Sequence, residues 1–155
     1  MPVESDEQFM EMALAEARKA ESADEVPVGA VVVVDGVVVA RGFNQPISAS
    51  DPTAHAEIVA LRDAARQGGN YRLSAATLYC TLEPCMMCAG AMIHARIPRL
   101  VFGTLDPKAG SAGSIYNVLT DPRLNHRVNV AIGVCQAECA ALLRDFFARR
   151  RKIAE

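Results

Sequence analysis

Two valine-rich runs joined by the dipeptide Asp35-Gly36 constrain the fold of this sequence more than any other feature. The first run covers residues 28–34 and the second covers residues 37–41, and both are almost free of polar side chains. An Asp-Gly pair between two such runs is typical of a two-residue β-hairpin turn. The runs therefore predict an antiparallel pair of strands, and their lack of polar alternation predicts that both strands are covered on both faces.

The rest of the chain alternates between helical patterns and short apolar runs. Ser5 and Gln8 have the spacing of a capping box, and Pro52 and Pro84 each suit the first turn of a helix. We expect helices over residues 6–22, 53–67, 84–96 and 136–152, a short helix over 114–120, and strands over 28–34, 37–41, 76–82, 100–103 and 128–134. Strands separated by helices require right-handed crossovers. The order therefore predicts an α/β fold, a three-layer α/β/α sandwich around a mixed five-stranded sheet.

Length and composition narrow the class of protein. The 155 residues contain no repeat and no linker, so we expect a single domain over residues 1–155. A hydrophobic content of 51% excludes disorder throughout the chain. No apolar run reaches about 18 residues, so we expect no membrane association. An acidic, amphipathic start is unlike a secretory signal, and five cysteines without such a signal favour the reducing cytoplasm.

Charge is distributed unevenly along the chain. The net charge of −2 does not by itself predict a nucleic-acid-binding protein. Residues 1–25 contain eight acidic and two basic side chains, whereas residues 144–155 contain five basic and two acidic ones. An acidic head and a basic tail are compatible with a polyanion that touches one face, and also with a solvated terminal helix.

Two short segments carry the residues of a metal site. The first is His55-Ala56-Glu57, and the second is Pro84-Cys85-Met86-Met87-Cys88, each at the expected start of a helix. Cys85 and Cys88 are three residues apart and share one helix face. The helix N-terminus and a cation both favour their thiolate forms. Two thiolates and one imidazole are the ligands of a catalytic zinc ion with an open fourth position, which activates water near neutral pH.

Glu57 is the expected acid and base of this site. Residues two apart on a helix point about 200° apart, so His55 and Glu57 reach one point only if the helix aims its first turn at the metal. Glu57 is then not a ligand but is placed to transfer protons. The two motifs together are the known signature of zinc-dependent nucleobase deaminases. A structural zinc site and a redox dithiol are the alternatives, while Cys80, Cys135 and Cys139 fit small core residues and His94 and His126 fit structural or surface positions.

Residues around both motifs resemble the bacterial tRNA-specific adenosine deaminases. The similar segments are residues 28–30, Asn44, 53–57, 81–91, 103–114 and 125–127, together with Phe146-Phe147 in a basic final helix, in collinear order from about Phe9 to Lys152. The resemblance implies a cytidine deaminase-like fold, one zinc ion per chain and a homodimer. It also implies an enzyme that converts adenosine to inosine at the wobble position of an arginine tRNA anticodon.

The same resemblance implies roles for individual residues. His55, Cys85 and Cys88 would bind zinc, and Glu57 would move protons. Asn44 would hydrogen-bond the target base, although it also fits a turn residue before Pro46. The remaining expected contacts are the backbone around Ala56 and Pro84 on the base, Asp106, Lys108, Asn125, His126 and Arg127 near the RNA, and Arg149, Arg150, Arg151 and Lys152 on its phosphates.

Two other functions remain open from the residues. A deaminase of a free base or nucleoside, such as guanine or cytosine, has the same metal site, and removal of the chain after Phe147 would distinguish it by sparing small substrates. A zinc-stabilised interaction module without catalysis is the second alternative. In such a module the substitution Glu57→Gln would have no effect.

Overall fold

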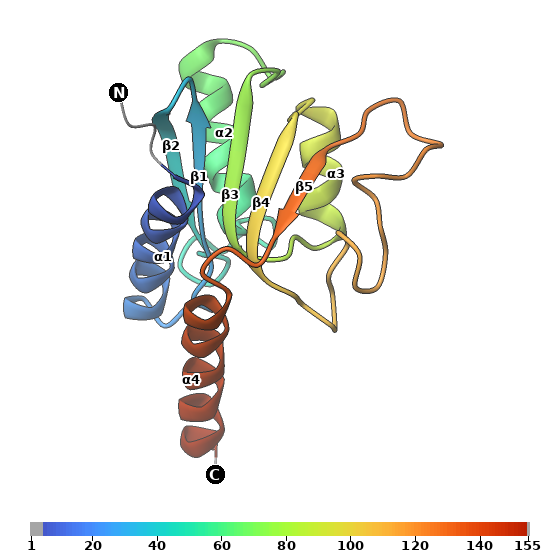
Figure 1. Cartoon of the computed structure of the whole chain (residues 1–155). Helices are drawn as coiled ribbons and strands as arrows, with labels where there is room; N and C mark the ends of the chain where they lie inside the picture. The colour runs from blue at the N-terminus through green and yellow to red at the C-terminus, as the bar shows by residue number, and fades with distance from the viewer. Residues whose placement is uncertain (1–4, 155) are drawn as a thin grey trace.

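A mixed sheet of five strands forms the centre of the computed structural model, which describes residues 5–154 (Figure 1). The strand order is β2-β1-β3-β4-β5. The strands are β1 (Gly29–Val34), β2 (Val37–Phe43), β3 (Ala76–Leu82), β4 (Arg99–Thr104) and β5 (Asn129–Ile132), and the helices are α1 (Asp6–Ser22), α2 (Ala56–Gly68), α3 (Met86–His94) and α4 (Gln136–Ala154). β1 is antiparallel to β2 and β3, whereas β3, β4 and β5 are parallel. The predicted mixed sheet is confirmed.

Two hydrophobic cores lie on opposite faces of the sheet. Ala30 and Val32 of β1 belong to the core beneath α2 and α3, whereas Val31 and Val33 belong to the core beneath α1 and α4. Side chains alternate between the faces of a strand, so a continuous run of valines supplies both cores. The predicted three-layer sandwich is therefore confirmed. The C-terminal half of α4 extends past the sheet (Figure 1), and Arg149 in this half pairs with Glu21 in the last turn of α1.

Local signals set the first helix and the first turn as predicted. The Ser5 N–H donates to Gln8 Oε1 at 2.7 Å, and the Gln8 N–H donates to Ser5 Oγ at 3.3 Å. Asp35 and Gly36 both have positive φ, 51° and 75°, which is the geometry that an Asp-Gly hairpin turn requires. The capping box and the β1–β2 hairpin are confirmed.

Two helices begin later than the prolines predict. α2 begins at Ala56 instead of residue 53, because Asp51 Oδ1 accepts hydrogen bonds from both the N–H and the hydroxyl of Thr53 at 2.8 Å. These bonds hold residues 51–53 in a turn. α3 begins at Met86 with Cys85 as its N-cap, so Pro84 precedes the helix instead of forming its first turn.

Two further predictions are wrong. Residues 114–120 form no helix, because the Gly113 N–H donates to the Tyr116 carbonyl and a bridge joins Ala112 to Asn117. Cover on both faces is correct for β1 but wrong for β2, which lies at the sheet edge with Val37 61% exposed.

The remaining expectations concern cysteines, histidines and membrane spans. Cys80 and Cys139 are buried core residues as predicted, whereas Cys135 is only half-buried, at the start of α4. His94 is exposed and His126 is half-buried. Within residues 5–154 no helix combines the length and the apolar character that crossing a membrane requires.

Candidate metal centre and active site

The first turns of α2 and α3 meet on one face of the sheet. His55 is the N-cap of α2 and Cys85 is the N-cap of α3, and neither side chain makes a capping hydrogen bond. Cys88 is buried in the first turn of α3. His55 Nδ1 lies 3.5 Å from the Sγ atom of Cys85 and 3.5 Å from that of Cys88. All three potential ligand atoms lie within 4.8 Å of one another.

This group fits a zinc ion. On a tetrahedral zinc with Zn–S of about 2.3 Å and Zn–N of about 2.0–2.1 Å, a sulfur and a nitrogen ligand are about 3.5 Å apart. Both measured distances from His55 match that separation. Two thiolates and an imidazole are preferred zinc donors, and three protein ligands leave a fourth position for water or substrate.

The ionisation state of Cys85 also favours binding of a cation. The pKa of Cys85 is lowered to about 4, chiefly because the Cys88 thiol hydrogen-bonds to its sulfur, with His55 contributing as well. The hydrogen bond to Cys85 and burial raise the pKa of Cys88, and the hydrogen bond to Cys85 raises the pKa of His55. The protein groups alone thus favour one thiolate, and a divalent ion bound there would ionise Cys88 too.

Glu57 lies beside the same group. Its side chain is in the first turn of α2 and is only 4% exposed. Burial raises the pKa of its carboxyl group, which is also close enough to His55 and Cys85 for their charges to act on it. The helix therefore aims its first turn at the three candidate ligands, which is the condition for His55 and Glu57 to act at one point. A protonatable carboxyl group next to the ligands is suited to general acid–base chemistry.

Asn44 and Gly42 hold the start of α2 in place. The Ala56 N–H donates to Asn44 Oδ1 at 2.8 Å. Gly42 of β2 lies so close to the helix that a Cβ atom there would overlap the Ala56 carbonyl oxygen and approach the Ala60 nitrogen to 2.7 Å. Only glycine at position 42 therefore allows β2 and α2 to approach each other this closely.

The predicted contacts of Asn44, Ala56 and Pro84 with the base remain predictions. The Ala56 N–H is occupied by Asn44, and the Pro84 carbonyl accepts from the Ser111 N–H at 2.8 Å. The side-chain amide of Asn44 keeps its NH2 group as a donor, since only its oxygen bonds Ala56.

Comparison with known proteins identifies the family. Residues 3–104 match the model for the cytidine and deoxycytidylate deaminase zinc-binding region. The tRNA-specific adenosine deaminase of Haemophilus influenzae is 51% identical over 150 residues, which cover 96% of this chain and 87% of that protein. The chain belongs to the tRNA-specific adenosine deaminase family. The matched region contains both motifs, so this deaminase has a zinc site, and His55, Cys85 and Cys88 have the geometry to form it.

Two solved structures resemble this deaminase closely. A structure described in work on A-to-I editing by tRNA:A34 deaminases at the wobble position has a TM-score of 0.85 and 48% identity, and the match covers 88% of this chain and 99% of that one. The guanine deaminase of Nitrosomonas europaea has a TM-score of 0.82 and 27% identity, over 96% of this chain and 87% of that one. Both support the cytidine deaminase-like fold.

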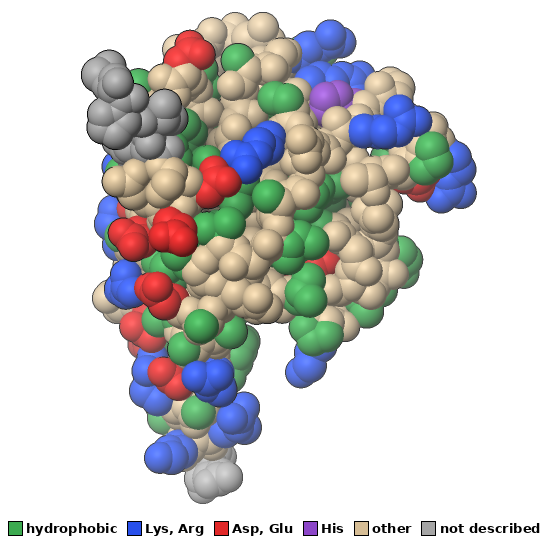
Figure 2. All heavy atoms as spheres, in the orientation of Figure 1, with side chains coloured by type: hydrophobic (Ala, Val, Ile, Leu, Met, Phe, Trp, Pro, Cys, Tyr) green, Lys and Arg blue, Asp and Glu red, His purple; other side chains and the backbone are tan. Residues whose placement is uncertain are grey.

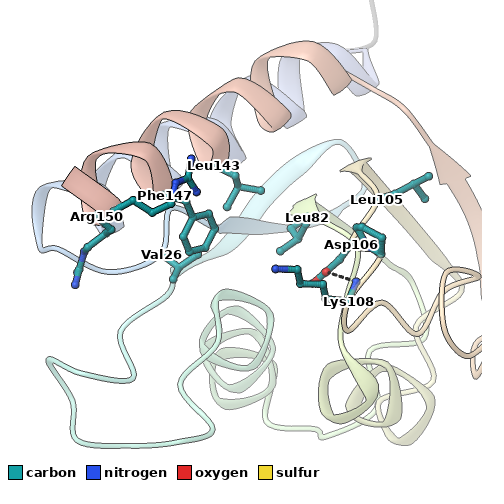
Figure 3. A pocket seen from close by; sticks show the side chains of 10 residues that line it. Val26, Leu82, Leu105, Asp106, Lys108, Leu143, Phe147 and Arg150 are labelled. Atoms are coloured by element: carbon teal, nitrogen blue, oxygen red, sulfur yellow. Dashed lines mark hydrogen bonds between the residues drawn. The ribbon is translucent and has the colours of Figure 1, made fainter. Parts of the chain in front are cut away.

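A groove runs between α4 and the loops near the metal centre. We call it the α4 groove. Its main cavity, of about 670 Å³, lies between α4 and the loop after β4 (Figure 3). A second hollow of about 450 Å³ shares Val26, Phe147 and Arg150 with the first and extends to Asn44. The main cavity is lined by Val26, Leu82, Leu105, Asp106, Pro107, Lys108, Leu143, Phe147, Arg150 and Arg151. The structure thus places Asp106, Lys108 and Asn44 along one groove.

Asn125, His126 and Arg127 lie elsewhere. Arg96 donates to Asn125 Oδ1 at 3.1 Å, and His126 Nε2 is 2.7 Å from the Ile97 carbonyl oxygen. Arg96 and Ile97 both follow the last residue of α3, whereas the candidate ligands Cys85 and Cys88 lie at its start. A helix of nine residues is about 13 Å long. The three residues are therefore distant from the metal centre of their own chain, and their contact with RNA remains a prediction.

Part of the basic tail is paired with the acidic head. Arg149 forms an ion pair with Glu21 of α1 at 2.9 Å. Arg150 donates to the Asp24 carbonyl oxygen and lies over the Phe146 ring at 5.0 Å. Figure 2 shows the acidic side chains over α1 beside the basic side chains at the end of α4. Two of the four predicted phosphate contacts thus have partners within the chain.

Two buried carboxylates beside the groove were missed by the sequence analysis. Glu25 and Glu83 are each only 2% exposed. Their hydrogen-bond partners lie between 22 and 31 residues away along the chain. No local pattern marks such partners, and the only signal was the position of Glu83 two residues before Cys85.

Proposed function

We propose that this protein deaminates adenosine to inosine at the wobble position of a tRNA anticodon. The observation that carries the proposal is the convergence of His55, Cys85 and Cys88 at the spacing of a zinc site, with the buried Glu57 carboxyl group beside them. The 51% identity to a tRNA-specific adenosine deaminase supports the substrate class. Arginine tRNA as the particular substrate is supported by the sequence resemblance alone.

The residues divide the chemistry between them. His55, Cys85 and Cys88 would hold the zinc ion, which supplies Lewis-acid activation of water. The water oxygen bonds to C6 of adenine, and the bond from C6 to the amino nitrogen breaks, so that water and adenosine give inosine and ammonia. Glu57 accepts a proton from the attacking water and delivers protons to the ring and to the leaving nitrogen. Its buried position beside the ligands suits both steps.

Residues around the metal centre would orient the adenine base and the RNA strand. The free NH2 group of Asn44 can donate to a ring nitrogen while its oxygen holds Ala56. Phe147, 44% exposed, gives the α4 groove an aromatic surface on which an unpaired base stacks. Lys108, Arg150 and Arg151 supply positive charge for phosphates along the same groove.

A panel of substrates tests this function. We would incubate the zinc-loaded protein with anticodon stem-loops that carry A, C or G at the wobble position, with free adenosine and with free guanine, and identify products by mass. We expect inosine from the wobble-A stem-loop. Product from guanine alone would instead support the activity of the relative from Nitrosomonas europaea, and product from none would leave a non-catalytic zinc module.

Glu57→Gln is the matched variant for the mechanism. Glutamine keeps the shape of the side chain but cannot exchange protons at neutral pH, so we expect turnover to fall about 100-fold to 10,000-fold. The variant should retain one zinc ion per chain, as measured by elemental analysis. Unchanged turnover would contradict the role of Glu57.

We also propose a cytoplasmic single-domain protein that forms a homodimer. The side chains that support a dimer surface are Met86, Ile115 and Tyr116, which are all about half exposed, at 52%, 51% and 55%. The apolar segment 89–93 does not offer such a surface, because Ala89, Met92 and Ile93 are buried in the core. Sedimentation equilibrium should give a dimer mass, and a monomer at micromolar concentration would contradict the proposal.

A further inference from the structure

The loop of residues 105–114, which follows β4, forms one wall of the α4 groove. Several of its N–H and hydroxyl groups donate hydrogen bonds to Glu83. This carboxylate accepts hydrogen bonds from the N–H groups of Asp106, Ala112 and Ser114, each at 3.0 Å, and from the Ser114 hydroxyl. The loop passes so closely that a Cβ atom on Gly110 would overlap the Glu83 carboxylate. Residues 105–108 of this loop line the main cavity. The buried charge therefore holds the wall in one position.

The second hollow of the groove has a wall of the same construction around Glu25. Its carboxylate accepts from the Ile47 N–H at 3.2 Å, from the Ser48 N–H at 2.7 Å and from the Ser48 hydroxyl. Asn44, Pro46 and Ile47 of this loop line the second hollow. Ile47 is 71% exposed, so its side chain contributes little packing that would hold the loop.

Both carboxylates connect a loop to a fixed part of the fold. Glu83 lies between β3 and α3, two residues before the candidate ligand Cys85. Glu25 follows Asp24, whose carbonyl oxygen accepts a hydrogen bond from Arg150 of α4. Each wall is thereby tied to an element that carries part of the proposed site.

A contribution to fold stability does not by itself explain why the Glu25 and Glu83 carboxylates are buried. Burying a charge is costly, and well-packed apolar residues often stabilise a fold as much as a buried charged group does. Three or four donors arranged around one carboxylate instead favour a single conformation of a loop that has no helix or strand of its own. A groove whose walls are ordered before binding loses less conformational entropy when a flexible strand enters it.

We propose that Glu25 and Glu83 are positioning residues that preform the two walls of the α4 groove for the RNA substrate. The inference rests on the proposed function for the identity of the ligand. The oxygens of both carboxylates are occupied by loop donors, so we assign the two residues no contact with the reacting atoms. Their effect is on substrate affinity, through the positions of the groove residues that they hold.

The variants Glu25→Gln and Glu83→Gln test this proposal, with Glu16→Gln as the control. Glu16 is also buried, at 3% exposed, but it pairs with Lys19 on α1 and does not line the groove. An amide has one acceptor oxygen in place of two, so at least one loop N–H loses its partner. We expect KM for the wobble-A stem-loop to rise roughly tenfold in each groove variant, as for loss of one hydrogen bond to a charged group. The value of kcat and the zinc content should change little.

A double-mutant cycle tests the contact between the loop and Glu83 directly. Gly110→Ala should raise KM in the wild-type background because its methyl group displaces the carboxylate. In the Glu83→Ala background the methyl group enters vacated space, so the same substitution should have little further effect. Gly68→Ala, at a position with no atom within 4 Å of the added carbon, is the glycine control.

Several outcomes would overturn the proposal. Unchanged KM in both groove variants would do so, and so would an equal rise in KM in Glu16→Gln, because that result indicates general destabilisation. If either glutamine variant fails to fold, Ser48→Ala and Ser114→Ala remove single donors and should produce smaller effects of the same sign.

Failure of the proposed function is distinguishable from failure of this inference. If the wild-type protein acts on no stem-loop, amide hydrogen exchange still measures the order of residues 46–50 and 106–114. Faster exchange confined to the wall of the substituted carboxylate supports the positioning role. Exchange as slow as in the wild type overturns it.

Discussion

Replacing Gly42 with alanine should displace the helix that carries His55 and Glu57. The added methyl carbon would lie 2.7 Å from the Ala60 nitrogen and closer still to the Ala56 carbonyl oxygen. Ordinary contacts of this kind are about 3.5 Å or longer, so the two elements must separate by about 0.8 Å or more. Because Ala56 lies between His55 and Glu57 in the sequence, the retreat of α2 moves both residues relative to α3.

The expected magnitude follows from that overlap. Overpacking a tight contact costs about 1–3 kcal/mol of unfolding free energy. For a chain of this size each kcal/mol lowers Tm by about 2–4 °C, so we expect a fall of about 2–12 °C. A displacement of about 1 Å in catalytic groups lowers the rate about 100-fold, so activity should fall further than stability suggests.

Calorimetry, elemental analysis of bound zinc and the stem-loop assay measure these effects together. Gly68→Ala is the control, because the last residue of α2 has nothing within 4 Å of the added carbon and should keep its Tm or gain slightly. If Gly42→Ala matches the wild type in Tm and in activity, the close packing of β2 against α2 does not position the site.

Two further substitutions probe other parts of the molecule. Asp6 accepts hydrogen bonds from the Tyr79 hydroxyl at 2.6 Å and from Arg99 at 2.8 and 3.0 Å, and the hydrogen bond to Arg99 is the main cause of its lowered pKa. Because the folded-state pKa is lowered, the ionised Asp6 carboxylate stabilises the fold above the unfolded-state pKa of about 3.9, and this stabilisation is lost as the pH falls through the folded-state pKa. Urea unfolding should therefore show Asp6→Asn about 1 kcal/mol less stable than the wild type at pH 7, with the difference shrinking as the pH falls below about 3.9. A pH-independent difference would contradict this. Phe147→Ala should weaken stem-loop binding by about 1–3 kcal/mol in fluorescence titrations, whereas Phe147→Trp should retain it, and equal affinities would exclude stacking on this ring.

Sequence patterns were sufficient where the structure depends on near neighbours. Ser5 and Gln8 cap α1 through bonds across three residues, and Asp35-Gly36 sets the hairpin through its own backbone angles. The two metal-binding motifs could also be recognised from the sequence alone. The two-residue spacing of His55 and Glu57 itself required a helix pointing end-on at the site, and α2 does so.

Most of the errors and omissions arise from partners that are distant in the sequence. The start of α2 has a partly local cause, because Asp51 holds residues 51–53 in a turn, and the N–H of its first residue, Ala56, then bonds to Asn44, twelve residues earlier. Residues 114–120 look helical, but the Ser114 N–H donates to Glu83. Nothing near Glu25 or Glu83 in the sequence shows that a loop wraps around each carboxylate. Such contacts exist only once the chain has folded.

Because the starts of α2 and α3 converge on the metal centre, zinc binding is also linked to the stability of the folded protein. His55 and Cys85 are separated along the chain by β3 and meet only when α2 and α3 have packed on the same face of the sheet. An ion that requires this assembled layer adds its binding free energy to that of folding. Zinc availability should therefore govern how long the native molecule survives thermal unfolding and proteolysis, in addition to how fast it turns over substrate.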